Sequence, residues 1–312
     1  MTNTKESSRD DNAKLSFYVL LKKRDGLNLS MFDNYWRDVH GPVCARLPGQ
    51  YQYWQFHLSH NHGGYWQKVD GVEYECSEHD QFDGIAELTF QNEEERNAWF
   101  SAASILMEDE HNIFSRAVGY VADNGNAITY KDTLSDGAPN GSATGPRFHM
   151  LLQKSDNVSV SDFRKYLSDS YIPALLESSA VSKLRSHFLE EHDNSEDLPP
   201  APGVDHYEPM DKQYQAAIEI AFHNQMEMER FFSSEQYARS IKDQASFVKR
   251  VNAFPVRDIY TFVYDGEMTM SGQRGSSTAS LIYEIGATNQ LLDNISHLMM
   301  NGEVQAQNQM TR

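Results

Sequence analysis

An internal repeat organises this chain of 312 residues. The segments from Phe17 to Pro42 and from Phe148 to Pro173 align without a gap at an offset of 131, and ten of the 26 positions are identical. Unrelated segments of ordinary composition would share roughly one or two. A second pair, residues 82–90 and 214–222, aligns at an offset of 132. The repeat therefore covers a whole folding unit rather than one motif.

Each copy reads as a β-α-β-β-α-β unit. Apolar runs and alternating patterns predict strands at residues 15–22, 51–58, 84–90 and about 127–131. Between them, Phe32, Tyr35, Trp36 and Val39 recur at helical spacing, and a second helix is expected from about Asn92. This order is the ferredoxin-like motif, whose open sheet face must be buried. The predicted fold class is α+β, with two ferredoxin-like repeats packed sheet on sheet in one chain.

The same patterns divide the chain. The predicted parts are a disordered tail (1–14), a first repeat (15–134), a Gly/Ser/Pro linker (135–146), a second repeat (147–264) and a C-terminal extension (265–312). The extension is expected to form one helix with an apolar stripe, made by Leu281, Ile285, Leu292, Ile295 and Met299. That stripe is interpreted as a packing surface, with a contact between two copies or a cover over a pocket as alternatives.

Composition excludes several kinds of partner. The chain carries 45 acidic and 27 basic residues, a net charge of −18, which repels nucleic-acid phosphates. No apolar run approaches the roughly 20 residues of a membrane span. The N-terminus lacks the apolar core of a signal peptide, and Cys44 and Cys76 do not form a CxxC pair. We expect a cytoplasmic protein that binds a small molecule, with a homodimer allowed.

Residues 32–43, FDNYWRDVHGPV, carry a resemblance to a known family. This segment resembles the signature of the EthD family, in which an aromatic residue, Tyr-Trp and His-Gly-Pro follow one another. Asp109-Glu110-His111 with Phe114 is similar to the acidic and aromatic stretch before the last strand of that family. The resemblance implies a dimeric α+β barrel, here intramolecular, in which the histidine at the helix end faces a pocket. Relatives of this fold include cofactor-free oxygenases, isomerases, cyclases, decarboxylases and haem proteins, so fold alone does not settle the reaction.

Candidate catalytic residues are His40, Glu87 and His57. His40 shares the apolar face of its helix with Phe32 and can exchange protons near neutral pH. Alternation in residues 214–222 turns Glu219 into the barrel, and the repeat places Glu87 likewise, where a carboxylate can act as a base or form an ion pair. The candidate substrate-binding residues are Trp36, Tyr51, Tyr53, Gln55 and Glu219, with His57 on the same side of its strand as Tyr53 and Gln55.

The polar signature is present in one repeat. The second copy has Leu167, Tyr171 and Phe188 where the first has Trp36, His40 and His57. Since these replacements cannot do proton chemistry at neutral pH, we expect one working site per chain, in the first repeat.

The sequence predicts an enzyme that needs neither a cofactor nor a metal. HNH at residues 60–62 lacks a third ligand at a recognised spacing, and His149, His187 and His223 are haem candidates without a motif. The leading hypothesis is acid/base chemistry on a small, apolar, conjugated molecule, of the lyase, isomerase or cyclase type: cyclisation, decarboxylation, dehydration or isomerisation. The family suggests secondary metabolism. The alternatives are a haem- or O₂-dependent oxidoreductase and a non-catalytic binding or stress protein.

Overall fold

The computed structural model describes residues 10–64, 66–123, 125–134, 137–193 and 201–304. The first repeat contains four strands, β1 (Leu15–Lys23), β2 (Gln52–Leu58), β3 (Gly84–Phe90) and β4 (Phe114–Ala122). Its helices are α1 (Leu29–Tyr35), the π-helical turn η1 (Trp36–His40), α2 (Gly41–Cys44), the 3-10 turn η2 (Glu78–Asp80), α3 (Glu93–Ala102) and α4 (Ser104–Ile113). The repeat thus has the expected β-α-β-β-α-β order.

The second repeat has the same order. Its strands are β7 (Arg147–Lys154), β8 (Val181–Phe188), β9 (Ala216–Phe222) and β10 (Val248–Tyr264). Its helices are α5 (Val160–Tyr166), the π-helical turn η3 (Leu167–Tyr171), α6 (Ile172–Leu176), α7 (Gln225–Phe232), α8 (Glu235–Ser240) and α9 (Gln244–Phe247). Repeated local chemistry produces the match, since Asn92 and its equivalent Asn224 both cap a helix by accepting a bond from the backbone three residues on.

The chain crosses to the other repeat at the end of each repeat. β10 pairs with β7 through residues 248–255 and then with β2 through residues 256–263. After β4, β5 (Ala127–Asp132) pairs with β8 in the same way. The two repeats therefore share one sheet, in the order β4-β1-β3-β2-β10-β7-β9-β8-β5. The fourth strand of the first repeat is β4, so the expectation near 127–131 was wrong: that segment belongs to the sheet of the other half.

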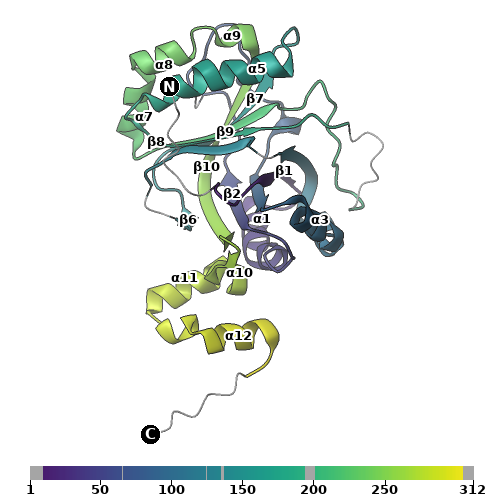
Figure 1. Ribbon diagram of the computed structural model, residues 1–312. Coiled ribbons are helices and arrows are strands. Elements are labelled where there is room, and N and C mark those ends of the chain that lie inside the picture. Colours follow the sequence, from purple (N-terminus) through teal and green to yellow (C-terminus); the bar gives the residue numbers. More distant parts are fainter. Residues whose placement is uncertain (1–9, 65, 124, 135–136, 194–200, 305–312) are drawn as a thin grey trace.

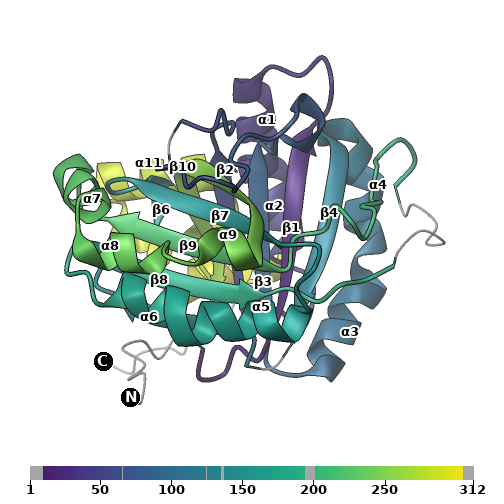
Figure 2. The same ribbon diagram turned by 90° about the horizontal axis from the view of Figure 1, so that it is seen from above.

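Apolar side chains form three layers. One layer, including Tyr18, Phe56 and Leu151, lies between the strands of the two repeats. The other two lie between strands and helices, one in each repeat. Helices α5, α7 and α8 cover the outside of the second repeat, and α1 and α3 cover that of the first (Figures 1 and 2). No helix in the described ranges is long and apolar enough to cross a membrane.

Three details of the expected layout need correction. In the expected disordered tail, residues 1–9 lie outside the described residues, but Asp10 is buried and pairs with Arg185 in the barrel. The expected linker contains a short strand, β6 (Asn140–Ser142), paired with β10. Over its described residues, 265–304, the extension begins with β11 (Glu267–Met268) and holds three helices and a 3-10 turn in place of one helix: α10 (Met270–Arg274), α11 (Ser276–Ile285), η4 (Thr288–Leu291) and α12 (Asp293–Asn301).

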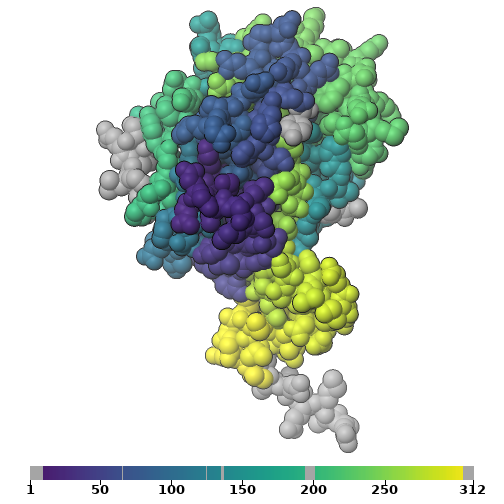
Figure 3. Space-filling view, turned by 180° about the vertical axis from the view of Figure 1, so that it is seen from behind, coloured from purple at the N-terminus to yellow at the C-terminus, as the bar shows by residue number. Residues whose placement is uncertain are grey.

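The extension projects from the first-repeat side of the molecule (Figure 3). Ala279 and Ile282 are buried against Met270. The expected apolar stripe is divided between α11 and α12, and Leu281, Ile285 and Met299 are exposed. The helix break at Gly286, whose φ of 72° suits glycine, separates the two parts of the stripe.

Candidate functional site

A cavity of about 800 Å³ lies in the first repeat, between the outer face of the sheet and the helices. Its walls are mainly apolar side chains from β1, β3, β4, α3 and α4, among them Phe17, Leu88, Trp99, Phe100 and Phe114. The polar or ionisable groups in the wall are His40, Cys44, Tyr53, Glu110, His192, Asp205, His206 and Tyr207. An apolar space of this size with a few polar groups is typical of a site for a small organic molecule.

His40 stands in the cavity wall with a carboxylate behind it. It is buried, and its Nδ1 lies 2.9 Å from Oδ2 of Asp109. Burial disfavours ionisation of Asp109, but hydrogen bonds from His40, Tyr35 and Asn112 outweigh it, and its pKa lies well below the usual range. Asp109 is therefore a carboxylate that accepts the Nδ1 proton, which leaves Nε2 of a neutral His40 able to accept another.

Two glycines allow the close packing around His40. His40 ends the π-helical turn η1, and Gly41 follows it with room for no side chain, because a Cβ there would lie 2.6 Å from the ring of Phe262. A Cβ at Gly84 would lie 2.4 Å from the indole of Trp36. The Trp36 ring can therefore lie against β3 and form part of the cavity wall.

Tyr53 and Gln55 lie on the outer face of β2, as their alternation indicates. The Gln55 amide nitrogen donates to the Trp36 carbonyl at 3.0 Å and to the Tyr53 hydroxyl oxygen at 2.8 Å. Since that oxygen already accepts a bond, the Tyr53 hydroxyl proton can be donated to the neighbouring Cys44 or to a ligand. Burial raises the pKa of Tyr53 well above its usual range and that of the Cys44 thiol to about 12, so both stay protonated.

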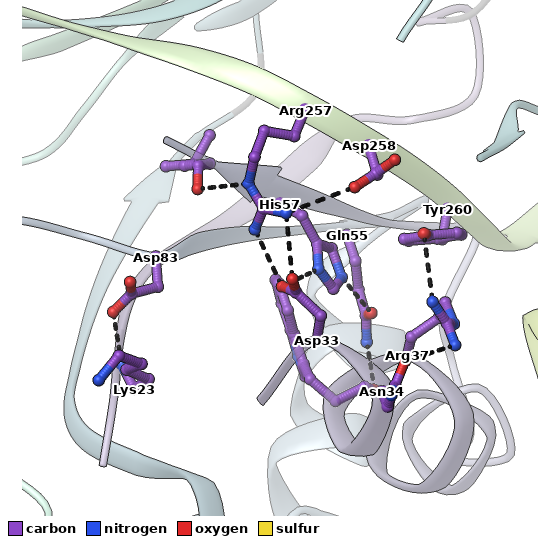
Figure 4. A network of polar contacts seen from close by, with 12 residues as sticks. Lys23, Asp33, Asn34, Arg37, Gln55, His57, Asp83, Arg257, Asp258 and Tyr260 are labelled. Carbon is purple, nitrogen blue, oxygen red and sulfur yellow. Dashed lines mark hydrogen bonds and ion pairs between the residues drawn. The ribbon is translucent and has the colours of Figure 1, made fainter. Parts of the chain in front are cut away.

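His57 lies behind the cavity rather than in its wall. Its Nδ1 is 2.7 Å from Asp33 and its Nε2 is 3.3 Å from Oε1 of Gln55 (Figure 4). Its ring stacks on that of Trp36, with the two ring centroids 4.5 Å apart. Burial lowers its pKa, and the neighbouring carboxylate of Asp33, which also pairs with Arg257, only partly offsets this. This places His57 where it holds Gln55 and Trp36 in position. Tyr51, by contrast, is half-buried and does not line the cavity.

Glu87 and Glu219 point into the barrel, on the opposite face of the sheet from the cavity. Glu87 accepts bonds from Arg185 at 2.8 Å and from Nε2 of His187 at 2.9 Å. Glu219 lies 3.4 Å from both Arg147 and Lys183. The inward direction follows from alternation, but both carboxylates belong to ion pairs inside the barrel. The structure thus groups His40, Trp36 and Tyr53 and separates Glu87 and Glu219 from them.

The second repeat contributes residues that the sequence reasoning did not select. Its loop between β8 and β9 brings Val204, Asp205, His206 and Tyr207 to the cavity of the first repeat. His206 lies with Nε2 3.3 Å from Glu110 and with Nδ1 2.9 Å from the carbonyl oxygen of Ala117. Periodicity along the sequence could not indicate which repeat this loop contacts.

In the second repeat the corresponding space is filled. Leu167 and Tyr171, the equivalents of Trp36 and His40, are fully buried in its outer core. Trp66 and Tyr74, from the loop between β2 and β3 of the first repeat, are buried in the same cluster. Each repeat thus sends a loop to the other, but large aromatic side chains occupy the gap in the second repeat.

Known proteins resemble this chain in sequence profile and in fold. The profile described as "EthD domain" matches residues 24–117 and 155–250. A putative monooxygenase from Fusobacterium nucleatum has 8% identity and a TM-score of 0.50, over 82% of this chain and 98% of that chain. An anthrone oxidase-like protein has 8% identity and a TM-score of 0.50, over 81% and 94%. No curated protein matches. At such identities the two structures establish the fold alone.

Proposed function

The chain belongs to the EthD domain family, and from its cavity we propose that it is an enzyme in which His40 removes a proton from a flat, largely apolar carbon acid, whose anion then reacts with dioxygen. One observation carries the proposal: the His40–Asp109 pair at the wall of an apolar cavity of about 800 Å³. Structures of this fold, described as a putative monooxygenase and as anthrone oxidase-like, are the reason for choosing dioxygen.

The chain's own residues support the first step. Asp109 keeps the Nδ1 proton on His40 and stabilises the imidazolium that forms when Nε2 accepts the substrate proton. The aromatic walls favour a delocalised anion over a compact, strongly hydrated one. The Tyr53 hydroxyl, held by Gln55, can donate to the substrate oxygen on which negative charge develops.

The overall reaction is balanced with dioxygen as the oxidant. The carbanion adds to O₂ to give a peroxide anion, which a proton converts to a hydroperoxide. Loss of the second proton from the same carbon breaks the O–O bond and leaves a carbonyl group and water. Both protons from carbon end in water, and no external electron donor is needed. Reprotonation of the same anion at another atom would give isomerisation, and expulsion of a leaving group from it would give a lyase reaction. Neither reaction consumes oxygen.

Haem, the cofactor of the oxidoreductase alternative, does not fit the described residues. His149 and His187 lie inside the barrel, bonded to Tyr18 and Glu87, and His223 is exposed. The cavity beside His40 has Glu110 and Asp205 in its wall, and no lysine or arginine among its described lining residues. The described lining therefore offers no cation that would pair with the two propionates of haem.

The test uses anthrone as a flat carbon acid and follows two steps separately. Exchange of its CH₂ protons in D₂O without oxygen reports proton removal, and oxygen uptake in air reports oxidation. We expect the protein to accelerate both, and His40→Ala to lower both by about 10²-fold. Binding of anthrone and related carbon acids without acceleration of either step would refute the enzyme and favour a binding protein. Exchange without oxygen uptake would favour an isomerase or lyase.

A further inference from the structure

Exposed apolar side chains of the described chain are concentrated on the C-terminal extension. Of the 18 large apolar side chains that are exposed, nine lie within residues 281–304. Leu281 and Ile285, one helical turn apart on α11, are 55% and 70% exposed. Leu292 at the start of α12 and Met299, seven residues later, are exposed as well. Most of the apolar stripe predicted from the sequence therefore lies at the surface.

Polar bonds attach the extension firmly to its own chain. The guanidinium of Arg46 donates to the carbonyl oxygens of Gly272 at 3.0 Å and Gln273 at 2.8 Å. A carboxylate oxygen of Asp38 accepts a bond from the backbone nitrogen of Ser277 at 2.9 Å, in the first turn of α11. None of the described residues of the extension lines the cavity of the first repeat. The extension is therefore a fixed part of the molecule and not a cover over that cavity.

The exposed apolar area is as large as a stable protein contact needs. The nine side chains are on average about half exposed, which at roughly 150–250 Å² for a large side chain amounts to roughly 800 Å². A standard protein interface buries roughly 800 Å² on each partner. The area is divided between neighbouring helices, so two copies that met here would bring α11 and α12 of each chain together.

Charge favours a second copy of this chain over a membrane surface. Residues 275–304 contain no lysine or arginine, whereas helices that lie in a membrane surface carry these cations on their polar face. The same residues contain only three acidic side chains, Glu284, Asp293 and Glu303, in a chain of which 23% of the residues are charged. The centres of protein interfaces are depleted of charged residues in this way.

The position of the extension also suits a contact between two acidic chains. The net charge of −18 makes two copies repel each other. Because α11 and α12 project beyond the barrel (Figures 1 and 3), a contact through them keeps the two barrels, with most of the charge, apart.

We propose that the extension is a dimerisation surface, on which α11 and α12 pack against the same two helices of a second copy about a two-fold axis. The stripe made by Leu281 and Ile285 lies at the centre of this contact. Each copy keeps its own cavity, because both halves of the barrel already belong to one chain.

The contact is tested by sedimentation of the full chain, without ligand, over a range of concentrations. We expect twice the mass of one chain, and dissociation on dilution. Leu281→Glu/Ile285→Glu should raise the dissociation constant by at least about 10²-fold, because like charges would then face each other. Leu292→Glu/Met299→Glu should do the same and decides the matter if the first variant does not fold. Met226→Glu, at a side chain 78% exposed on α7, is the control and should leave the dimer intact. A single chain at every concentration overturns the proposal, as does equal dissociation of the control.

Mixing two charged variants tests whether the extensions face each other. Leu281→Glu/Ile285→Glu and Leu281→Lys/Ile285→Lys should each be single chains when alone. Mixed in equal amounts they should form a dimer, because opposite charges then meet across the two-fold axis. A mixture that stays dissociated overturns the contact between two extensions. Dimerisation of the lysine variant alone would also overturn it, since the partner surface would then be an acidic one elsewhere on the chain.

Discussion

Replacing Asp109 by asparagine should reverse the tautomer of His40. Oδ1 of Asp109 accepts bonds from Tyr35 at 2.6 Å and from Asn112 at 3.0 Å, whereas Oδ2 accepts one from His40 at 2.9 Å. The amide of asparagine has only one oxygen. At the Oδ1 position this oxygen accepts bonds from both Tyr35 and Asn112, whereas at the Oδ2 position it would accept only the bond from His40. The amide NH₂ then faces Nδ1 of His40, which must accept, so the ring proton moves to Nε2 and the base is lost.

The size of the effect follows from those contacts. The extra hydrogen bond favours the wrong tautomer by about 1 kcal/mol, and the imidazolium loses a carboxylate partner worth about 1.5–3 kcal/mol. The sum, about 3 kcal/mol, predicts a fall of roughly 10²-fold in the rate of proton removal. Because Asp109 is partly exposed, the free energy of unfolding should change by less than about 2 kcal/mol.

The assay combines anaerobic proton exchange with nitrogen NMR of His40, which should show the proton on Nε2 in Asp109→Asn. Adding Tyr35→Phe supplies the control. That change removes one donor at Oδ1, so the two amide orientations become nearly equal and part of the activity should return. An Asp109→Asn variant within threefold of the unmodified rate would refute the reasoning, as would a double variant no faster than the single one.

Three further outcomes are expected. Tyr171→Phe should leave oxygen uptake within twofold, against the large loss in His40→Ala; equal losses would place the site in the wrong repeat. Trp66→Ala should lower the free energy of unfolding in urea by about 3–5 kcal/mol, because the ring fills the second-repeat gap, and a loss under about 1 kcal/mol would contradict that packing. Burial lowers the pKa of His149 to about 3. As the pH falls, the His149 imidazole of the unfolded chain is protonated near pH 6.5, before that of the folded chain. The folded state therefore has its full stability with respect to His149 above about pH 6.5 and loses it progressively toward pH 3. Between these pH values, the denaturation midpoint of His149→Gln should depend less on pH than that of the unmodified chain.

The sequence pattern predicts on which face of its helix or strand each candidate site residue lies. The helical recurrence from Phe32 placed His40 on the apolar face of its helix, and the structure puts it in the cavity wall. Alternation correctly placed Tyr53 on one side of β2 and turned Glu87 into the barrel. Combining these residues into one site failed, because residues on opposite faces of a sheet cannot share a cavity.

What the sequence by itself determined is local: the repeat, the strand and helix periods, the capping residues and the face on which each side chain lies. These depend on contacts within a few residues along the chain. Tertiary packing decided the rest. It sent β5 to the other repeat, brought His206 to within 3.3 Å of Glu110 across 96 positions, and filled one of two equivalent gaps with Trp66. Such contacts join segments that no period relates, so their partners are chosen only when the two halves pack against each other.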